Sequence, residues 1–108
     1  MARALINAPA VARAGEIIEI RTLITHPMET GFRPGVDGKT LARDIISRFT
    51  CQYNGEVVFS AELFSAVAAN PFIAFHTVAT KSGVLLCTWE GDNGFMESAS
   101  VSITVLGQ

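Results

Sequence analysis

The stretch IISRFTCQYNGEVVFSAELF, residues 45–64, contains two β-rich runs separated by the dipeptide Asn54-Gly55. Asn and Gly both tolerate positive φ angles, so this pattern predicts a β-hairpin closed by a type I′ turn. Tyr53 would then face Glu56 across the turn. The prediction fixes two neighbouring antiparallel strands, around which the other segments can be arranged.

The side chains of this hairpin are apolar on both of its faces. In a two-layer sandwich one face of each sheet meets water. The surplus apolar face therefore indicates cover by another protein, unless a β-bulge re-phases one of the strands. With an unbroken register Cys51 faces Val58 and Thr50 faces Phe59; one face then carries Phe49, Cys51, Tyr53 and Val58, and the other Val57, Phe59 and Ala61.

The rest of the chain also divides into short β-type segments between glycine and proline residues. Residues 16–25 and 97–105 alternate apolar and polar side chains, which is typical of strands with one buried face. Residues 71–79 (PFIAFHTVA) are almost continuously apolar, which favours a strand buried on both faces. Together with residues 3–7 and 84–90, these segments predict an all-β chain: an immunoglobulin-like sandwich of about seven antiparallel strands, forming one domain over residues 1–108.

Composition narrows the function classes. The 108 residues are 49% hydrophobic and carry a net charge of −2. No apolar run is long enough for a membrane span, and we expect neither a membrane protein nor a secretory signal in this chain. There is no basic stripe interleaved with aromatic residues, so we expect no nucleic-acid partner.

Cys51 and Cys87 are the candidate reactive thiols, on strands expected to be neighbours in one sheet. Buried thiols that pack as small hydrophobes, a cross-strand disulfide and a reactive thiol all remain open. A copper site would need two histidines beside the cysteine, and zinc would need closer ligand spacing. His76 lies within an apolar strand and is expected to be half-buried. We therefore expect no metal, no cofactor and no enzyme activity.

A long loop follows the strand at residues 16–25. Residues 26–44 include three glycines and two prolines, and loops of this length are usually functional or disordered. His26, Met28, Glu29 and Arg33 are the candidate recognition residues of this loop, with Met28 as an adaptable apolar contact. Lys39 and Arg43 add positive charge that can steer acidic partners.

Several of these segments together resemble the SoxZ family. They are EIRTLITHPMETGFR, DGK, IISRFTCQYNGEVVFSAEL, AVAANPFIAF and CTWEGDNG, and they cover about residues 15–94. The resemblance implies an immunoglobulin-like sandwich without catalytic activity, paired with SoxY in the SoxYZ carrier of the sulfur-oxidation (Sox) system. Cys51 stands at the family's RFTC position, whereas Cys87 replaces what is more often an aromatic residue.

The resemblance also implies how such a chain works. SoxY carries sulfur intermediates of thiosulfate oxidation on a cysteine near its C-terminus and presents them to other Sox enzymes, which dock transiently. This chain would be the scaffold of the heterodimer and would work in the periplasm, exported with SoxY because it has no signal peptide. Two alternatives stay open: a carrier in its own right through Cys51 or Cys87, and a free-standing binding module. The candidate interface residues are Val57, Phe59, Phe72 and Phe75.

Overall fold

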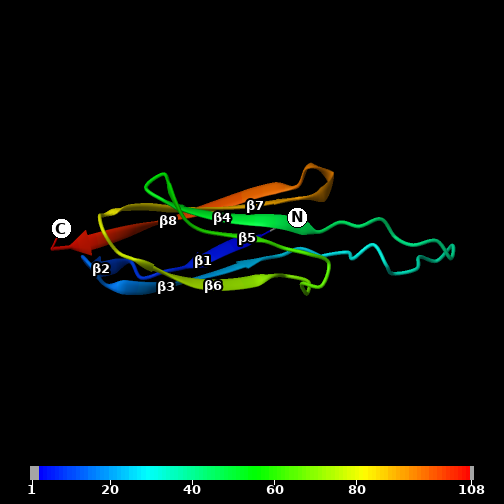
Figure 1. Ribbon diagram of the computed structural model, residues 1–108, viewed down its shortest axis with the longest axis horizontal. Helices are drawn as coiled ribbons and strands as arrows, with labels where there is room; N and C mark the ends of the chain where they lie inside the picture. Colours follow the sequence, from blue (N-terminus) through cyan, green and yellow to red (C-terminus); the bar gives the residue numbers. More distant parts are fainter. Residues whose placement is uncertain (1–2, 108) are drawn as a thin grey trace.

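The computed structural model describes residues 3–107, which form eight β-strands in two sheets (Figure 1). A short 3₁₀ turn, Asp92–Gly94, joins the last two strands. None of the described residues belongs to a helix long and apolar enough to cross a membrane. The strands are β1 (Ala4–Asn7), β2 (Val11–Arg13), β3 (Ile17–Ile24), β4 (Ile46–Tyr53), β5 (Glu56–Glu62), β6 (Phe72–Val78), β7 (Gly83–Gly91) and β8 (Met96–Leu106).

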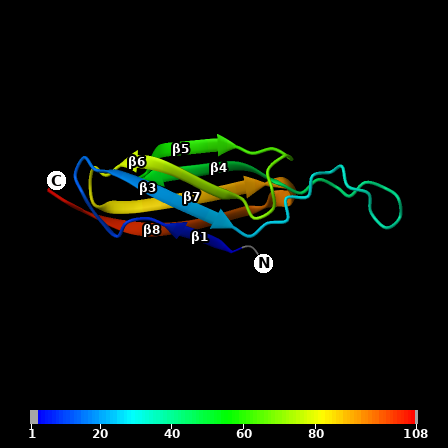
Figure 2. The same cartoon turned by 90° about the horizontal axis from the view of Figure 1, so that it is seen from below.

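The sheets stack as the two layers of an immunoglobulin-like sandwich, as the alternating segments predicted. The smaller sheet has the order β1-β3-β6, and the larger has the order β2-β8-β7-β4-β5. Figure 2 shows the smaller sheet lying across the larger one. The predicted alternation of β8 is confirmed, since Ile103 and Val105 are buried while Ser100, Ser102 and Thr104 are exposed.

One strand pairing departs from the expected antiparallel arrangement. The N-terminal segment changes sheets near Pro9: β1, at the expected first strand, pairs antiparallel with β3, and β2, which was not expected, then pairs parallel with β8. Proline lacks a backbone N–H and cannot continue a ladder on both sides, so it suits the point at which the chain changes sheets. The same segment thereby contributes an edge strand to each sheet, which raises the expected seven strands to eight.

The hairpin at residues 45–64 forms as predicted, with a bulge that explains its two apolar faces. Asn54 and Gly55 have φ angles of 51° and 84°, as a type I′ turn requires, and Tyr53 pairs with Glu56. The register then shifts, so that Cys51 pairs with Phe59 and Val58 is the extra residue. The unbroken register is therefore wrong, and the alternative of a bulge is confirmed.

The core lies between the two sheets. Ile18, Ile20, Phe49, Leu85 and Trp89 are almost completely shielded from solvent, and the rings of Phe49 and Trp89 lie 5.2 Å apart. β3 contributes one face to this core and leaves the other to solvent, which is the period-two pattern of its sequence.

The expectation for residues 71–79 is wrong. β6 is an edge strand of the smaller sheet with a single buried face, on which Phe75 is 5% exposed. Phe72, His76 and Val78 lie on the opposite, outer face and are exposed. His76 is thus not half-buried; its Nε2 lies 3.9 Å from Glu19 Oε2 at the surface.

Candidate functional site

The long loop forms a projecting arm, defined here as residues 29–44. The molecule measures 61 × 20 × 19 Å, and the arm extends from one end of the sandwich along the longest axis (Figure 1). Its two sides run antiparallel, with backbone N–H groups of Glu29 and Asp44 donating to each other's carbonyl oxygens at 2.8 and 2.9 Å. Farther out, Leu41 N–H donates to Arg33 O at 2.8 Å. Backbone hydrogen bonds therefore join the two sides of the arm at its root and again farther out.

His26 lies at the base of the arm, inside the protein. It is 4% exposed, and its ring packs edge-on against Phe95 at 4.9 Å. His26 Nδ1 accepts a hydrogen bond from Met28 N–H at 2.9 Å, which leaves Nε2 directed toward Asp44 Oδ1 at 3.8 Å. An imidazole that accepts at Nδ1 carries its proton on Nε2 when neutral. His26 thus joins the two sides of the arm at their root.

Met28 is likewise buried, contrary to the expectation that it offers an apolar contact to a partner. It is 4% exposed, and its sulfur accepts a hydrogen bond from Ile46 N–H at 3.2 Å. Its φ angle is 49°, a left-handed conformation that non-glycine residues rarely adopt. The two buried candidates, His26 and Met28, therefore anchor the arm, and only Glu29 and Arg33 of the four lie at its surface.

A second clamp joins the arm to the turn between β7 and β8. The Arg43 guanidinium donates to both carboxylate oxygens of Asp92, each at 2.9 Å. Asp92 Oδ2 also accepts from Ile45 N–H at 3.1 Å. The Arg43 guanidinium, followed by the Ile45 amide, lowers the pKa of Asp92 from its ordinary value. This bidentate pair fixes the exit of the arm toward β4.

Farther along the arm the side chains face solvent. Arg33 forms a close ion pair with Glu29, at 2.6 Å between the nearest nitrogen and oxygen, and this lowers the pKa of Glu29. Phe32 and Val36 are both exposed. An exposed phenylalanine and valine on a well-anchored extension are typical of a contact element.

The outer face of the smaller sheet carries a row of exposed apolar side chains. Leu5, Leu23 and Phe72 are direct neighbours across β1, β3 and β6, and all three are exposed. At the opposite end of the same face, Ile17 and Val78 are paired and exposed. We call the first set the apolar row. Such a contiguous patch on a sheet is a common mark of a protein interface.

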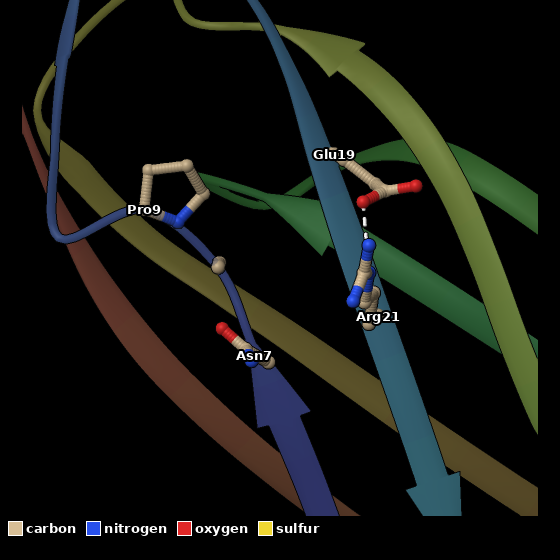
Figure 3. A pocket seen from close by; sticks show the side chains of 5 residues that line it. Asn7, Pro9, Glu19 and Arg21 are labelled. Carbon is tan, nitrogen blue, oxygen red and sulfur yellow. Dashed lines mark hydrogen bonds and ion pairs between the residues drawn. The ribbon is translucent and has the colours of Figure 1, made fainter.

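A polar band lies between these two apolar ends. Arg21 Nε donates to Glu19 Oε1 at 2.8 Å, and both side chains border a shallow, open hollow beside Asn7 and Pro9 (Figure 3). Figure 3 shows the carboxylate and the guanidinium lying along the outer side of β3. A hollow that is this open and polar does not suit the enclosed binding of a small molecule.

The four candidate interface residues are not brought together. Phe59 and Phe75 stack on each other at 4.5 Å with an angle of 8° between their rings, and they close the side of the sandwich between β5 and β6. Phe75 is 5% exposed and belongs to the core of this chain. Val57, on β5, and Phe72, on β6, are 53% and 62% exposed and lie on different sheets. Leu5 and Leu23 were missed, although the alternation of residues 16–25 places Leu23 on the face opposite the core.

The two thiols do lie together. Cys51 and Cys87 are direct partners in the antiparallel pairing of β4 and β7, both have 0% exposure, and they are not disulfide-bonded. The thiol–thiol hydrogen bond with Cys51, followed by burial, raises the pKa of Cys87 above its ordinary value. Both thiols are inaccessible to solvent, which is the environment of structural rather than reactive thiols.

No cluster of metal ligands accompanies these features. Over residues 3–107, no three His, Cys, Asp or Glu side chains are grouped in a way that could hold a metal ion.

Comparison with solved structures supports the fold. A superoxide reductase (neelaredoxin) from Ignicoccus hospitalis superposes with a TM-score of 0.73 at 19% identity, over 94% of this chain and 79% of that one. A putative superoxide reductase from Thermotoga maritima gives 0.68 at 18% identity, over 94% and 84%. The CARDB domain of a Pyrococcus furiosus protein gives 0.61 at 13% identity, over 99% and 95%. At these identities the likeness concerns the sandwich fold alone.

Sequence comparison identifies the family. No curated protein sequence matches this chain. The family model described as sulphur oxidation protein SoxZ matches residues 6–102, which is nearly the whole chain and includes every strand from β3 to β7 together with the arm. The chain therefore belongs to the SoxZ family and has a role in the sulfur-oxidation (Sox) system.

Proposed function

We propose that this chain is the non-catalytic scaffold of a SoxYZ heterodimer, in which SoxY carries the sulfur intermediates of thiosulfate oxidation on its C-terminal cysteine. The observation that carries the proposal is the burial of both thiols, Cys51 and Cys87, at 0% exposure. A carrier thiol has to enter the active sites of other proteins. These two lie on the inner face of the larger sheet and are buried in the core, so the carrier thiol is proposed to come from the partner.

The apolar row is the proposed contact with SoxY. Leu5, Leu23 and Phe72 form a continuous strip across three paired strands. The cores of stable interfaces are depleted in charge and enriched in aromatic side chains, and Phe72 is the only aromatic side chain of that strip. Of the four candidate interface residues, Phe72 lies in this row, whereas Phe59 and Phe75 stack on each other across the two sheets.

The experiment is co-expression of this chain with the SoxY of the same organism, followed by native mass spectrometry after incubation with thiosulfate and the other Sox enzymes. The expected result is a heteromer in which every sulfur adduct maps to SoxY. A monomer with adducts on Cys51 or Cys87 would instead support the alternative of a carrier in its own right. A stable monomer without adducts, indifferent to SoxY, would support a free-standing binding module.

The arm is the proposed contact for the other Sox enzymes, which dock transiently. Its exposed side chains include Phe32, Arg33 and Val36, none of which belongs to the apolar row. The matched test compares Val36→Ser with Val84→Ser, an exposed valine on the outer face of the larger sheet. Slower turnover of SoxY-bound sulfur for Val36→Ser alone, with SoxY affinity unchanged, is expected; equal turnover for both variants would count against the arm.

The proposed compartment is the periplasm, reached by export together with SoxY. The support is the family relationship, since the carrier system that the resemblance implies works there. Cell fractionation with and without SoxY tests the idea. The chain is expected in the periplasmic fraction only when SoxY is present, and periplasmic recovery without SoxY would contradict joint export.

A further inference from the structure

Cys51 and Cys87 occupy the centre of the larger sheet. They are opposite one another in the antiparallel pairing of β4 and β7, between the neighbouring pairs Phe49–Trp89 and Tyr53–Leu85 on the same inner face. No register shift separates the cysteines from either neighbouring pair. The two side chains therefore point to the same side of the sheet next to each other, and the strand pairing keeps the two sulfur atoms close.

This arrangement meets the Cα separation that a disulfide requires. Opposite residues of antiparallel strands have Cα atoms about 4.5–5.5 Å apart, and disulfides span Cα separations of about 4.4–6.8 Å. The strand pairing thus provides the Cα separation that the bond needs, and rotation of the two side chains would bring the sulfur atoms together.

Access, however, is closed in the folded protein. Both residues are completely shielded from solvent, and the sulfur atoms lie on the face that the smaller sheet covers. An oxidant that acts by thiol–disulfide exchange has to touch the sulfur that it attacks. Oxidation is therefore possible in the unfolded or partly folded chain and blocked once the sandwich has closed.

From this juxtaposition we infer that Cys51 and Cys87 are a latent cross-strand disulfide site, whose redox state is set while the chain folds and is retained afterwards. With a small disulfide such as glutathione disulfide, one thiolate attacks the oxidant to form a mixed disulfide and releases one glutathione thiol. The second cysteine thiolate then attacks the sulfur of the first and releases the second glutathione. The two cysteines lose two protons and two electrons, and the oxidant gains them.

The bond would close a loop of the 35 residues between the two positions and the cysteines themselves. Cross-links of this span restrict the unfolded chain considerably. For a domain of this size the oxidised form is expected to melt about 10–15 °C above the reduced form. This stabilisation does not depend on the proposed function.

The test begins with the full chain unfolded in guanidinium chloride and refolded with glutathione disulfide and glutathione, or with a reductant. The expected oxidised product lacks two hydrogen atoms by intact mass, yields a cross-linked peptide containing both cysteines, and melts at the higher temperature. Protein that refolds in the oxidising buffer with two thiols still open to alkylation after denaturation would overturn the inference. So would a cross-linked form that melts below the reduced one.

A second arm of the experiment treats already folded, reduced protein with the same oxidant. The thiols are expected to stay reduced for as long as the protein stays folded. Oxidation at the rate of the unfolded chain would overturn the claim that the redox state is set during folding. Cys51→Ala and Cys87→Ala are the controls, because a single thiol cannot form the cross-link and neither variant should gain melting temperature in the oxidising buffer.

Discussion

Truncation of Phe72 to alanine provides the sharpest test of the proposed contact with SoxY. A phenylalanine side chain buries about 200 Å² when it is fully covered. Since Phe72 is 62% exposed in this chain, about 120 Å² remains available for a partner. At about 25 cal/mol per Å² this corresponds to about 3 kcal/mol, of which alanine retains a part. The expected loss of about 2 kcal/mol weakens the dissociation constant about thirtyfold.

The assay is a titration of SoxY against the wild-type chain and the variant, by calorimetry or by surface immobilisation. Phe64→Ala is the matched control, because Phe64 is 65% exposed but lies in the segment after β5, outside the apolar row. Both variants should keep their melting temperature close to that of the wild type, since neither phenylalanine is part of the core. If Phe72→Ala binds SoxY within about twofold of the wild type, the apolar row is not the energetic centre of the interface.

Three further predictions concern the framework of the site. Phe75→Ala removes the buried partner of the Phe59 stack and should cost about 3–5 kcal/mol of unfolding free energy, measured by denaturant titration; a loss below about 1 kcal/mol would contradict its place in the core. In the Asp92→Asn variant, the unfolding free energy should fall less steeply at acid pH than it does in the wild type. Arg43 lowers the folded-state pKa of Asp92, so the ionised Asp92 stabilises the fold above its unfolded-state pKa, and this stabilisation is lost as pH falls through the folded-state pKa. If the Arg43–Asp92 pair contributed nothing, the melting temperatures of the wild type and Asp92→Asn would show the same pH dependence in this acid range. Gly91→Ala places a Cβ 2.4 Å from Ile45 O, so β7 and β4 must separate locally, and a cost of about 1–3 kcal/mol is expected; an unchanged melting temperature would show that the backbone yields freely there.

Much of the fold follows from short-range patterns. The Asn54-Gly55 turn specifies a hairpin, and the alternation of residues 97–105 specifies a strand and its buried face, each within a few residues. The bulge in β5 was not determined in the same way. Val57, Val58 and Phe59 are all apolar, so the sequence is compatible with either register. The register is selected by packing against the other sheet, above all by the stacking of Phe75 on Phe59.

The candidate site shows the limits of local reasoning more clearly. His26 and Met28 follow a strand in a polar, glycine-containing loop, and nothing within that loop predicts burial. They are buried by residues distant in sequence: Phe95 packs against the His26 ring, and the Ile46 N–H donates to the Met28 sulfur. The prediction for β6 was wrong in the opposite direction. Its apolar outer residues were expected to be buried, but an exposed apolar surface can have the same composition as a core strand.

The change of sheets near Pro9 has a mechanical consequence. On one side of the sandwich a single continuous segment, β1 followed by β2, is hydrogen-bonded into both sheets, so the layers cannot part there without breaking backbone ladders. On the other side the edges β5 and β6 belong to different sheets and meet through the stacked rings of Phe59 and Phe75. The two sheets should therefore separate first at the β5 and β6 edges, while the side held by β1 and β2 stays closed. In hydrogen exchange, the amide hydrogens of β5 and β6 should exchange well before those of β3 and β8.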